Sequence, residues 1–148
     1  MVQTATTYTA RVTDGVAMRI ATIGAGNIGR AFASLAIEAG HEVLVSNSRD
    51  PKTLDQFARE SGALTGSADD AAAFGDLVLV AIPFVRALEL EQGRLAGKIV
   101  VDANNYYPER DGAIRELDDN EITTSELVAR RFPDADWSRP STRSWPAT

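Results

Sequence analysis

The chain of 148 residues contains no cysteine and only one histidine. The absence of cysteine excludes disulfide bonds and thiolate metal ligands, and it fits a reducing, cytoplasmic location. Basic residues are also few, since 15 Lys and Arg stand against 21 Asp and Glu and give a formal net charge of −6. This balance argues against a nucleic-acid partner, because phosphate backbones attract clustered positive charge.

Long apolar runs are missing as well. No stretch approaches the roughly 20 apolar residues that a bilayer-spanning helix needs, and residues 1–17 lack the charged start and apolar middle of a secretory signal. The sequence therefore indicates no membrane partner. An apolar fraction of 44% is ordinary for a globular protein, and the length suits one domain with one core.

Residues 1–17 are rich in threonine and show no periodicity that would bury one face. We expect them to form a disordered N-terminal extension. Because Met18 lies directly before the first predicted strand, we hypothesise that it is the natural start of the protein. N-terminal sequencing of native protein that began at Val2 would count against this hypothesis.

The most informative stretch is a short apolar run, residues 19–23, that leads into Gly24-Ala25-Gly26-Asn27-Ile28-Gly29. The spacing G-x-G-x-x-G is typical of a dinucleotide-binding turn between a strand and a helix. The first glycine permits a tight turn, the second leaves room for a pyrophosphate, and the third lets the helix pack close to the strand. Unpaired N–H groups at the start of the helix then favour phosphate binding.

Apolar residues follow the glycines at helical spacing, and we expect them to form the apolar side of this helix: Ile28, Phe32, Leu35, Ala36 and Ala39.

Further strands and helices alternate along the chain. Strands are predicted at residues 41–46, 63–65, 76–82 and 98–102, and helices after Asp50, after Ser67, over 85–90 and over 124–131. This alternation indicates a parallel sheet with right-handed crossovers. The predicted fold class is therefore α/β, a doubly wound parallel sheet of the Rossmann, NAD(P)-binding type, over residues 18–136. Its ligand crevice lies at the carboxyl ends of the strands.

The residues after the second strand bear on the choice of nucleotide. NAD-specific versions of this fold usually carry Asp or Glu about 20 residues after the glycines, but here the strand ends in Ser46-Asn47-Ser48-Arg49. Ser48 and Arg49 would suit a 2′-phosphate, which predicts NADP(H). A solvated loop with an unrelated arginine is the alternative. Asp50 would act as the NAD-type acid if the loop were displaced by one or two positions, although we expect it to cap the next helix.

Taken together, these segments resemble the family of NADP oxidoreductases that depend on the deazaflavin coenzyme F-420. The resemblance extends from Met18 to about Asp136 and rests on residues 18–29, Ser48-Arg49, residues 82–84 and residues 102–105. It implies that residues 25–28 line the pyrophosphate, that Ser48 and Arg49 bind the 2′-phosphate, and that Ile82-Pro83 borders the nicotinamide. Members of the family transfer hydride between NADP and the deazaflavin.

Such a reaction needs positioned cofactors rather than acid–base side chains. No catalytic residue is assigned, and no cluster predicts a metal site. His41 is expected to be a solvent-facing turn residue away from the crevice. Asn104 and its neighbours would bond the nicotinamide carboxamide or a substrate carbonyl, or would simply form a turn. The predicted cofactor-binding residues are Gly24, Ala25, Gly26, Asn27, Ile28, Gly29, Ser48, Arg49, Ala81, Ile82, Pro83 and Asn104.

Residues 137–148 do not fit the predicted fold. They hold both tryptophans and two of the six prolines, without a strand pattern, where the fold and the family place a sixth strand. Codons can be chosen for them that, with one base restored in front, read V-V-K-A-F-N-T-I-L-A-R-D. We hypothesise a one-base deletion after Asp136, which genomic codons incompatible with that reading would refute. The sheet would then lack its last strand and leave the fifth as an open edge.

Three functions follow as hypotheses. The leading one is an NADP-dependent oxidoreductase that transfers hydride between NADP and a deazaflavin or related acceptor. The second is a truncated NADP-binding module without turnover, and the third is a reductase of a small imine or carbonyl compound. The expected partners are a small-molecule or cofactor substrate and, by the family's subunit contact, a possible second copy in a homodimer.

Overall fold

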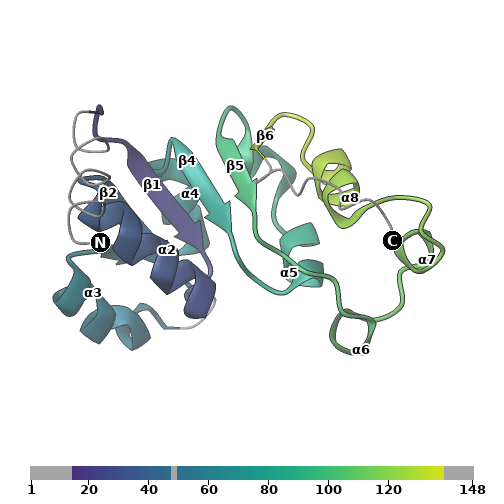
Figure 1. Cartoon of the computed structure of the whole chain (residues 1–148), viewed down its shortest axis with the longest axis horizontal. Coiled ribbons are helices and arrows are strands. Elements are labelled where there is room, and N and C mark those ends of the chain that lie inside the picture. Colours follow the sequence, from purple (N-terminus) through teal and green to yellow (C-terminus); the bar gives the residue numbers. More distant parts are fainter. Residues whose placement is uncertain (1–14, 48–49, 139–148) are drawn as a thin grey trace, which may run out of the picture.

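The computed structural model describes residues 15–47 and 50–138. They form a six-stranded parallel sheet in the order β3-β2-β1-β4-β5-β6 (Figure 1). The predicted doubly wound α/β fold is therefore confirmed. The strands are β1 Arg19–Ile23, β2 Glu42–Ser46, β3 Leu64–Gly66, β4 Leu77–Val80, β5 Ile99–Asp102 and β6 Asp136–Ser138.

Helices and short helical turns connect the strands. They are α2 Asn27–Glu38, α3 Asp55–Ser61, α4 Ala68–Phe74, α5 Phe84–Leu88, α6 Pro108–Asp111, α7 Arg115–Asp118, α8 Thr124–Arg131 and the 3-10 helices η1 Pro51–Leu54 and η2 Gln92–Leu95. Ser67 and Thr123 start α4 and α8 with capping boxes. Asp50 caps η1 by accepting a hydrogen bond from Lys52 N at 3.0 Å, as the sequence predicted.

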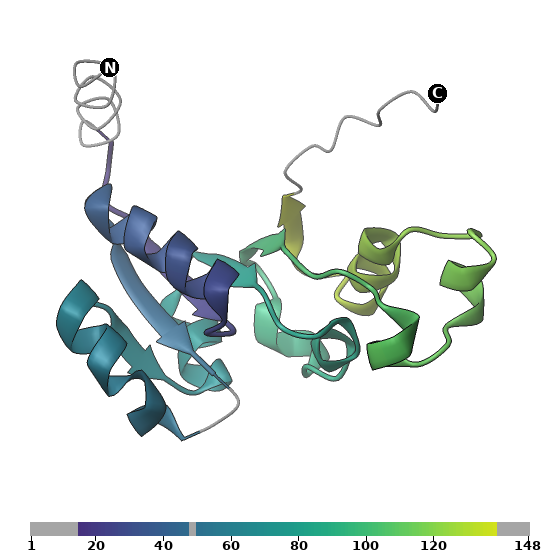
Figure 2. The ribbon, with the colours of Figure 1, turned by 60° about the horizontal axis from the view of Figure 1, so that its bottom comes forward.

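Alternate residues of each strand point to opposite faces of the sheet. On one face Ile20, Val43 and Val45 pack with Ala33 and Ala36 of α2. On the other face Ala21, Leu44, Val78 and Val100 pack with residues of α4, α5 and α8. Both faces of the central strands are thus buried, which explains their nearly continuous apolar sequence. The segment of α6, α7 and α8 lies at the opposite end of the molecule from α3 (Figures 1 and 2).

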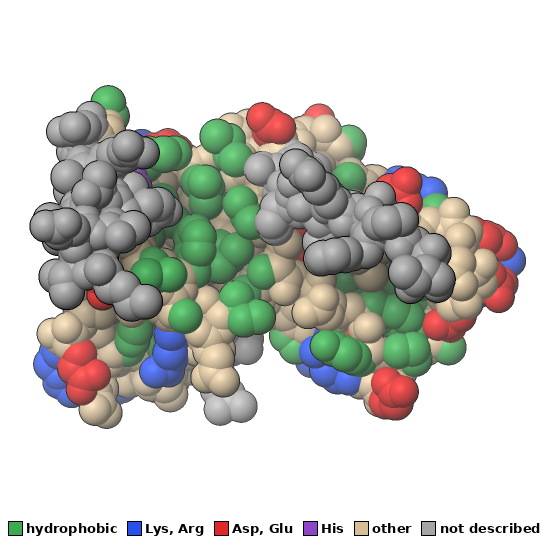
Figure 3. All heavy atoms as spheres, in the orientation of Figure 1, with side chains coloured by type: hydrophobic (Ala, Val, Ile, Leu, Met, Phe, Trp, Pro, Cys, Tyr) green, Lys and Arg blue, Asp and Glu red, His purple; other side chains and the backbone are tan. Residues whose placement is uncertain are grey.

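The apolar side predicted for α2 is partly wrong. The helix buries Gly29, Ala33 and Ala36, whereas Ile28 and Leu35 are 56% and 65% exposed. The reason is the close approach of the helix to the sheet, which only small side chains allow beneath it, so that larger ones lie on its flanks. Figure 3, which has the orientation of Figure 1, shows apolar side chains near the middle of the face on which α2 lies.

The expectation that the sheet lacks its last strand also needs correction. β6 pairs in parallel with β5, and Val100 lies opposite Trp137. The strand is only three residues long. It can form without an apolar pattern, because the hydrogen bonds between parallel strands join backbone groups. Residues 139–148 and the N-terminal residues 1–14 lie outside the described ranges, so the hypotheses about both ends stay predictions.

Candidate functional site

The turn after β1 is shaped by close backbone contacts. Gly24 has a φ of +115°, a conformation that residues with a Cβ rarely adopt. A Cβ at Gly24 would lie against the carbonyl oxygen of Ala81 and 2.8 Å from its carbonyl carbon. The N–H of Gly24 donates to the carbonyl of Ser46 at 2.9 Å. The turn therefore passes directly between the ends of β2 and β4, and only glycine fits there.

The other two glycines of the motif differ from each other. A Cβ at Gly29 would collide with the carbonyl oxygen of Gly24, which also accepts a hydrogen bond from Thr22 Oγ1 at 3.1 Å. A Cβ at Gly26 would have no atom of the described residues within 4 Å. Gly26 is the N-cap of α2 and has no side chain to accept a hydrogen bond from the first N–H groups of this helix.

Arg30 adds a cation beside this turn that sequence reasoning missed. Its Nε donates to the carbonyl of Ala25 at 2.8 Å, and its guanidinium lies 5.4 Å from the centre of the Phe57 ring. The position of Arg30 in the sequence could have indicated this role, since it follows the last glycine directly and belongs to the first turn of α2. It brings positive charge to the end of the helix that is already electropositive.

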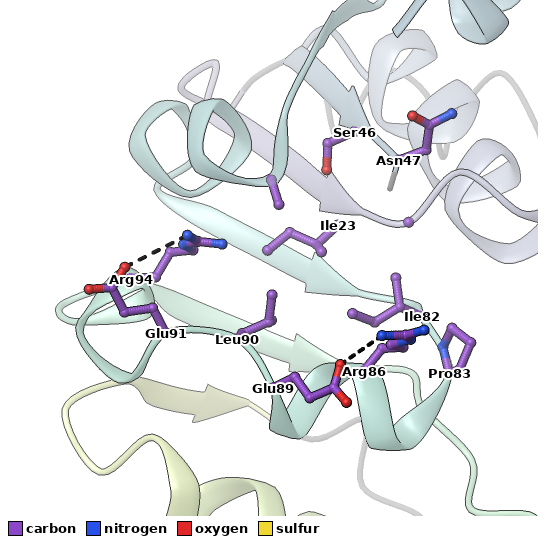
Figure 4. Close-up of a pocket in the computed structure, with 12 residues that line it drawn as sticks. Ile23, Ser46, Asn47, Ile82, Pro83, Arg86, Glu89, Leu90, Glu91 and Arg94 are labelled. Carbon is purple, nitrogen blue, oxygen red and sulfur yellow. Dashed lines mark hydrogen bonds and ion pairs between the residues drawn. The ribbon is translucent and has the colours of Figure 1, made fainter. Parts of the chain in front are cut away.

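A cavity of about 670 Å³ opens beside the turn, at the carboxyl ends of β1 and β2 (Figure 4). Its size is within the range of small-molecule sites. The residues that line it are Ile23, Gly24, Ser46, Asn47, Ala68, Ile82, Pro83, Arg86, Glu89, Leu90, Glu91 and Arg94. Figure 4 shows Ile23, Ile82 and Leu90 around the hollow, between the pairs Arg94–Glu91 and Arg86–Glu89.

The two arginines of the cavity are held differently. Arg94 pairs with Asp69 and lies 3.7 Å from a carboxylate oxygen of Glu91, and its side chain is only 21% exposed. Arg86 pairs with Glu89 at 2.9 Å, and its side chain is 69% exposed. Neither arginine was predicted from the sequence, although Arg86 stands three positions after Pro83 and so near the carboxyl end of β4. Arg86 is the cation that is freer to turn toward a ligand.

Asn104 does not line the cavity, but its side chain is hydrogen-bonded to a residue that does. Its Oδ1 accepts from the N–H of Ile82 at 3.0 Å, and its Nδ2 donates to Asp102 Oδ1 at 2.8 Å. The backbone N–H of Asn104 donates to the same Asp102 oxygen at 2.9 Å, and Ser125 of α8 donates to Asp102 Oδ2 at 3.3 Å. With 8% exposure, Asn104 is more than a turn residue.

Asp111 makes a second contact between the residues that follow β5 and the residues that follow β4. Its side chain has no exposed surface, and it accepts hydrogen bonds from Arg110 and from the backbone N–H of Tyr107 and Val85. The Arg110 guanidinium, followed by these two N–H groups, lowers the pKa of Asp111 to about 2 against the opposing effect of desolvation. Val85 belongs to α5, so Asp111 ties α6 to the start of α5.

The structure brings most of the predicted residues together. Residues 24–29 and 81–83 meet at one place, where the Ala81 carbonyl approaches Gly24, and Asn104 holds Ile82 from behind. Ser48 and Arg49 lie outside the described residues. Asn47, directly before them, donates from Nδ2 to Thr53 Oγ1 at 2.7 Å.

The expectation that His41 faces solvent needs correction. It lies at the amino end of β2, away from the cavity as expected, but it is half-buried, and its Nδ1 accepts a hydrogen bond from Met18 N at 3.1 Å. The reason is that the chain entering β1 runs beside it. Among residues 15–47 and 50–138 no group of three or more His, Cys, Asp or Glu could hold a metal ion. The same residues contain no helix that could cross a membrane.

Residues 19–106 match the family described as NADP oxidoreductase, coenzyme F420-dependent, and this match covers more than half of the chain. The chain belongs to this family. The matched region begins with β1 and ends after β5. It therefore contains the glycine turn and all the residues that line the cavity. For the NADP oxidoreductase family this is the nucleotide-binding part of the fold.

Solved structures agree on the fold. A hypothetical protein from Sinorhizobium meliloti matches with 27% identity over 82% of this chain and 60% of its own, with a TM-score of 0.66. An imine reductase from Bacillus cereus matches with 24% identity over 82% of this chain and 38% of its own, with a TM-score of 0.59. A reductive aminase from Aspergillus terreus, solved with NADPH and ethyl levulinate, matches with 18% identity over 84% and 40%, with a TM-score of 0.58.

The chain thus spans 38% to 60% of the length of these solved proteins. No curated protein matches its sequence significantly.

Proposed function

We propose that this chain is the NADP(H)-binding part of an oxidoreductase that transfers hydride between NADP and a deazaflavin or related acceptor. The main support for the proposal is the presence of glycine at position 26. Its backbone angles, φ −77° and ψ −167°, are open to any residue, and no described atom lies near its Cβ position. The fold itself gives no reason for glycine there. A diphosphate resting on the start of α2 supplies one.

The proposed nucleotide extends from this turn to both sides. The pyrophosphate lies along Ala25, Asn27 and Ile28, and the adenosine occupies the cavity beside Ile82. Ser48 and Arg49 directly follow the cavity residue Asn47 and would hold the 2′-phosphate, with Arg86 as a second cation on the same cavity. The guanidinium group suits a phosphate dianion, which supports NADP over NAD.

The segment of Ala81, Ile82 and Pro83 follows the central strand β4, so it would border the adenosine on one side and the nicotinamide on the other, and Asn104 accepts the N–H of Ile82. When bound, NADPH supplies the hydride, and the chain supplies position and exclusion of water. The deazaflavin acceptor is proposed from the family. A small imine is the second candidate, because imine reductases and a reductive aminase share this fold. We propose a cytoplasmic protein whose acceptor site includes parts beyond this domain, with a second copy as its partner.

Isothermal titration of NADPH, NADH and the deazaflavin against one preparation tests the proposal. We expect NADPH to bind more tightly than NADH, and Arg49→Ala to reduce this preference at least about tenfold, the effect of about 1.4 kcal/mol. Arg59→Ala is the matched control, because Arg59 is an exposed arginine of α3 that does not line the cavity. An unchanged preference in Arg49→Ala would refute the assignment of that residue.

Turnover separates the remaining functions. Oxidation of NADPH with the deazaflavin supports the leading proposal, and oxidation with a small imine or carbonyl compound supports a reductase of such compounds. Tight NADPH binding without oxidation by either acceptor would mean that this chain is a binding module only. Absence of NADPH binding would overturn the proposal altogether.

A further inference from the structure

The segment that follows β4 borders the cavity, yet it obtains few hydrogen bonds from its own neighbours in the sheet. The N–H of Ala81 still donates to the carbonyl of Ile23 in β1 at 2.9 Å. The next donor, the N–H of Ile82, finds a side chain instead, Asn104 Oδ1 at 3.0 Å. Pro83 has no N–H to offer, and the N–H of Val85 donates to Asp111. Two side chains from further along the chain, Asn104 and Asp111, thus accept N–H groups of this segment.

Asn104 can hold Ile82 in this way because it is itself fixed. The Asp102 carboxylate accepts from both the backbone N–H and the side-chain Nδ2 of Asn104, at 2.9 and 2.8 Å. These two bonds orient the amide so that Oδ1, and not the NH₂ group, faces Ile82. Ser125 on α8 donates to the other oxygen of Asp102 at 3.3 Å. The contact therefore runs from α8 through the end of β5 to the edge of the cavity.

We propose that Asn104 is a positioning residue for the nucleotide: it fixes the backbone of Ile82, and through it the cavity wall of Ile82 and Pro83, instead of contacting the nucleotide itself. The inference rests on the proposed function. A buried amide whose acceptor oxygen is occupied, and whose NH₂ group already donates to a carboxylate, serves better to hold a neighbouring loop than to recognise a ligand. Loss of the contact lets the wall move, and nucleotide binding weakens at the adenosine end.

A fragment without nicotinamide separates this role from direct contact. Adenosine 2′,5′-bisphosphate carries the adenosine and 2′-phosphate only. If Asn104 positions the cavity wall, Asn104→Ala weakens the fragment and NADPH alike, each by about tenfold, the size of one lost hydrogen bond. If Asn104 bonds the nicotinamide carboxamide, NADPH weakens and the fragment binds as before, which would overturn the inference. Asn105→Ala, at the exposed neighbouring position, is the matched control and should change neither affinity.

A second variant keeps the test valid if Asn104→Ala does not fold. Asn104→Asp retains an oxygen that can accept from Ile82 but places it beside Asp102, the titratable group that contacts Asn104 in the structure. At neutral pH the two carboxylates repel each other; at lower pH they share a proton, and the acceptor is restored. We expect the fragment to bind Asn104→Asp weakly at pH 8 and to recover severalfold toward pH 5. The wild type and Asn105→Asp should not recover in this way.

The two levels of the proposal fail differently. If the wild type binds neither NADPH nor the fragment, the proposed function fails. If the wild type binds both, and the Asn104 variants bind the fragment equally well at every pH, only the positioning role fails.

Discussion

Residues 24–29 and residues 81–85 form neighbouring sides of one site but are held in place by different means. The first segment relies on backbone: Gly24 and Gly29 lack side chains where a Cβ would strike a carbonyl, and Gly26 leaves open space at the start of α2. The second relies on side chains from far along the chain, because Asn104 and Asp111 accept its N–H groups. The first is thus built locally, and the second depends on tertiary packing.

The two segments should therefore respond differently to mutation. A turn made of glycines is sensitive to any added atom but needs no distant partner. A segment whose N–H groups are accepted by distant side chains depends on those side chains and on its own packing. Four predictions test this difference, from the largest expected effect to the smallest.

Phe84→Ala should damage the second segment most. Phe84 is fully buried and meets the Tyr106 ring edge-on, with 5.8 Å between the ring centres, so removing it leaves a cavity and should cost about 3–5 kcal/mol of unfolding free energy in urea. Leu35→Ala, at a position 65% exposed, should change stability by no more than about 0.5 kcal/mol. Equal losses in both variants would show that this segment is not packed as described.

Gly29→Ala and Gly26→Ala should separate folding from binding in the first segment. The Cβ at position 29 meets the Gly24 carbonyl, so we expect a loss of about 1–3 kcal/mol in stability. The Cβ at position 26 meets no described atom, and stability should stay within about 0.5 kcal/mol. NADPH affinity, measured by titration, should nevertheless fall at least about tenfold in Gly26→Ala. Normal affinity in that variant would remove the main support for the diphosphate site.

Asp111→Asn should change the acid sensitivity of the second segment. The pKa of Asp111 is lowered to about 2 from an ordinary value of 3.8, so its ionised form stabilises the fold above about pH 4, and this contribution is lost as the pH falls toward 2. Urea midpoints at pH 6, 4 and 2 should therefore differ most between wild type and variant at pH 6 and converge at pH 2. Asp134→Asn, at an exposed position, is the control. A constant difference across this range would contradict the prediction.

Arg86 should contribute the smallest effect. Its side chain is 69% exposed and shared with Glu89, so solvent screening limits its attraction for a phosphate. We expect Arg86→Ala to weaken NADPH by about two- to fivefold and NADH by less. Glu89→Gln should act in the opposite direction, since it frees the guanidinium. If both variants shift NADPH affinity in the same direction, the ion pair does not control access to this cation.

Several features could be predicted from residues close together in the sequence. The glycine turn, the cap at Asp50 and the strand–helix alternation depend on local conformational preferences and on periodicity. The exposure of Ile28 and Leu35 was not predictable in this way. Their helical spacing is real, but how closely α2 approaches the sheet depends on Gly29 and on the path of the turn beneath it.

The polar residues show the same limit. Asn104 was recognised as a candidate because it follows a strand end, but its partner is Ile82, 22 positions earlier. The pattern around Asn104 is equally compatible with a turn or a ligand contact, and only the arrangement of β4 beside β5 selects the partner. His41 and Met18 are a second case, joined across 23 positions at the other end of the sheet.

The sequence by itself determined the parallel α/β fold, the position of the glycine turn and the absence of cysteine chemistry, because each follows from composition or from short-range spacing. The tertiary structure decided which glycine of the motif has no atom near its Cβ position, which arginines line the cavity, and that Asn104 accepts the N–H of Ile82. These depend on distances between segments that are remote in the chain, and no local pattern specifies such distances.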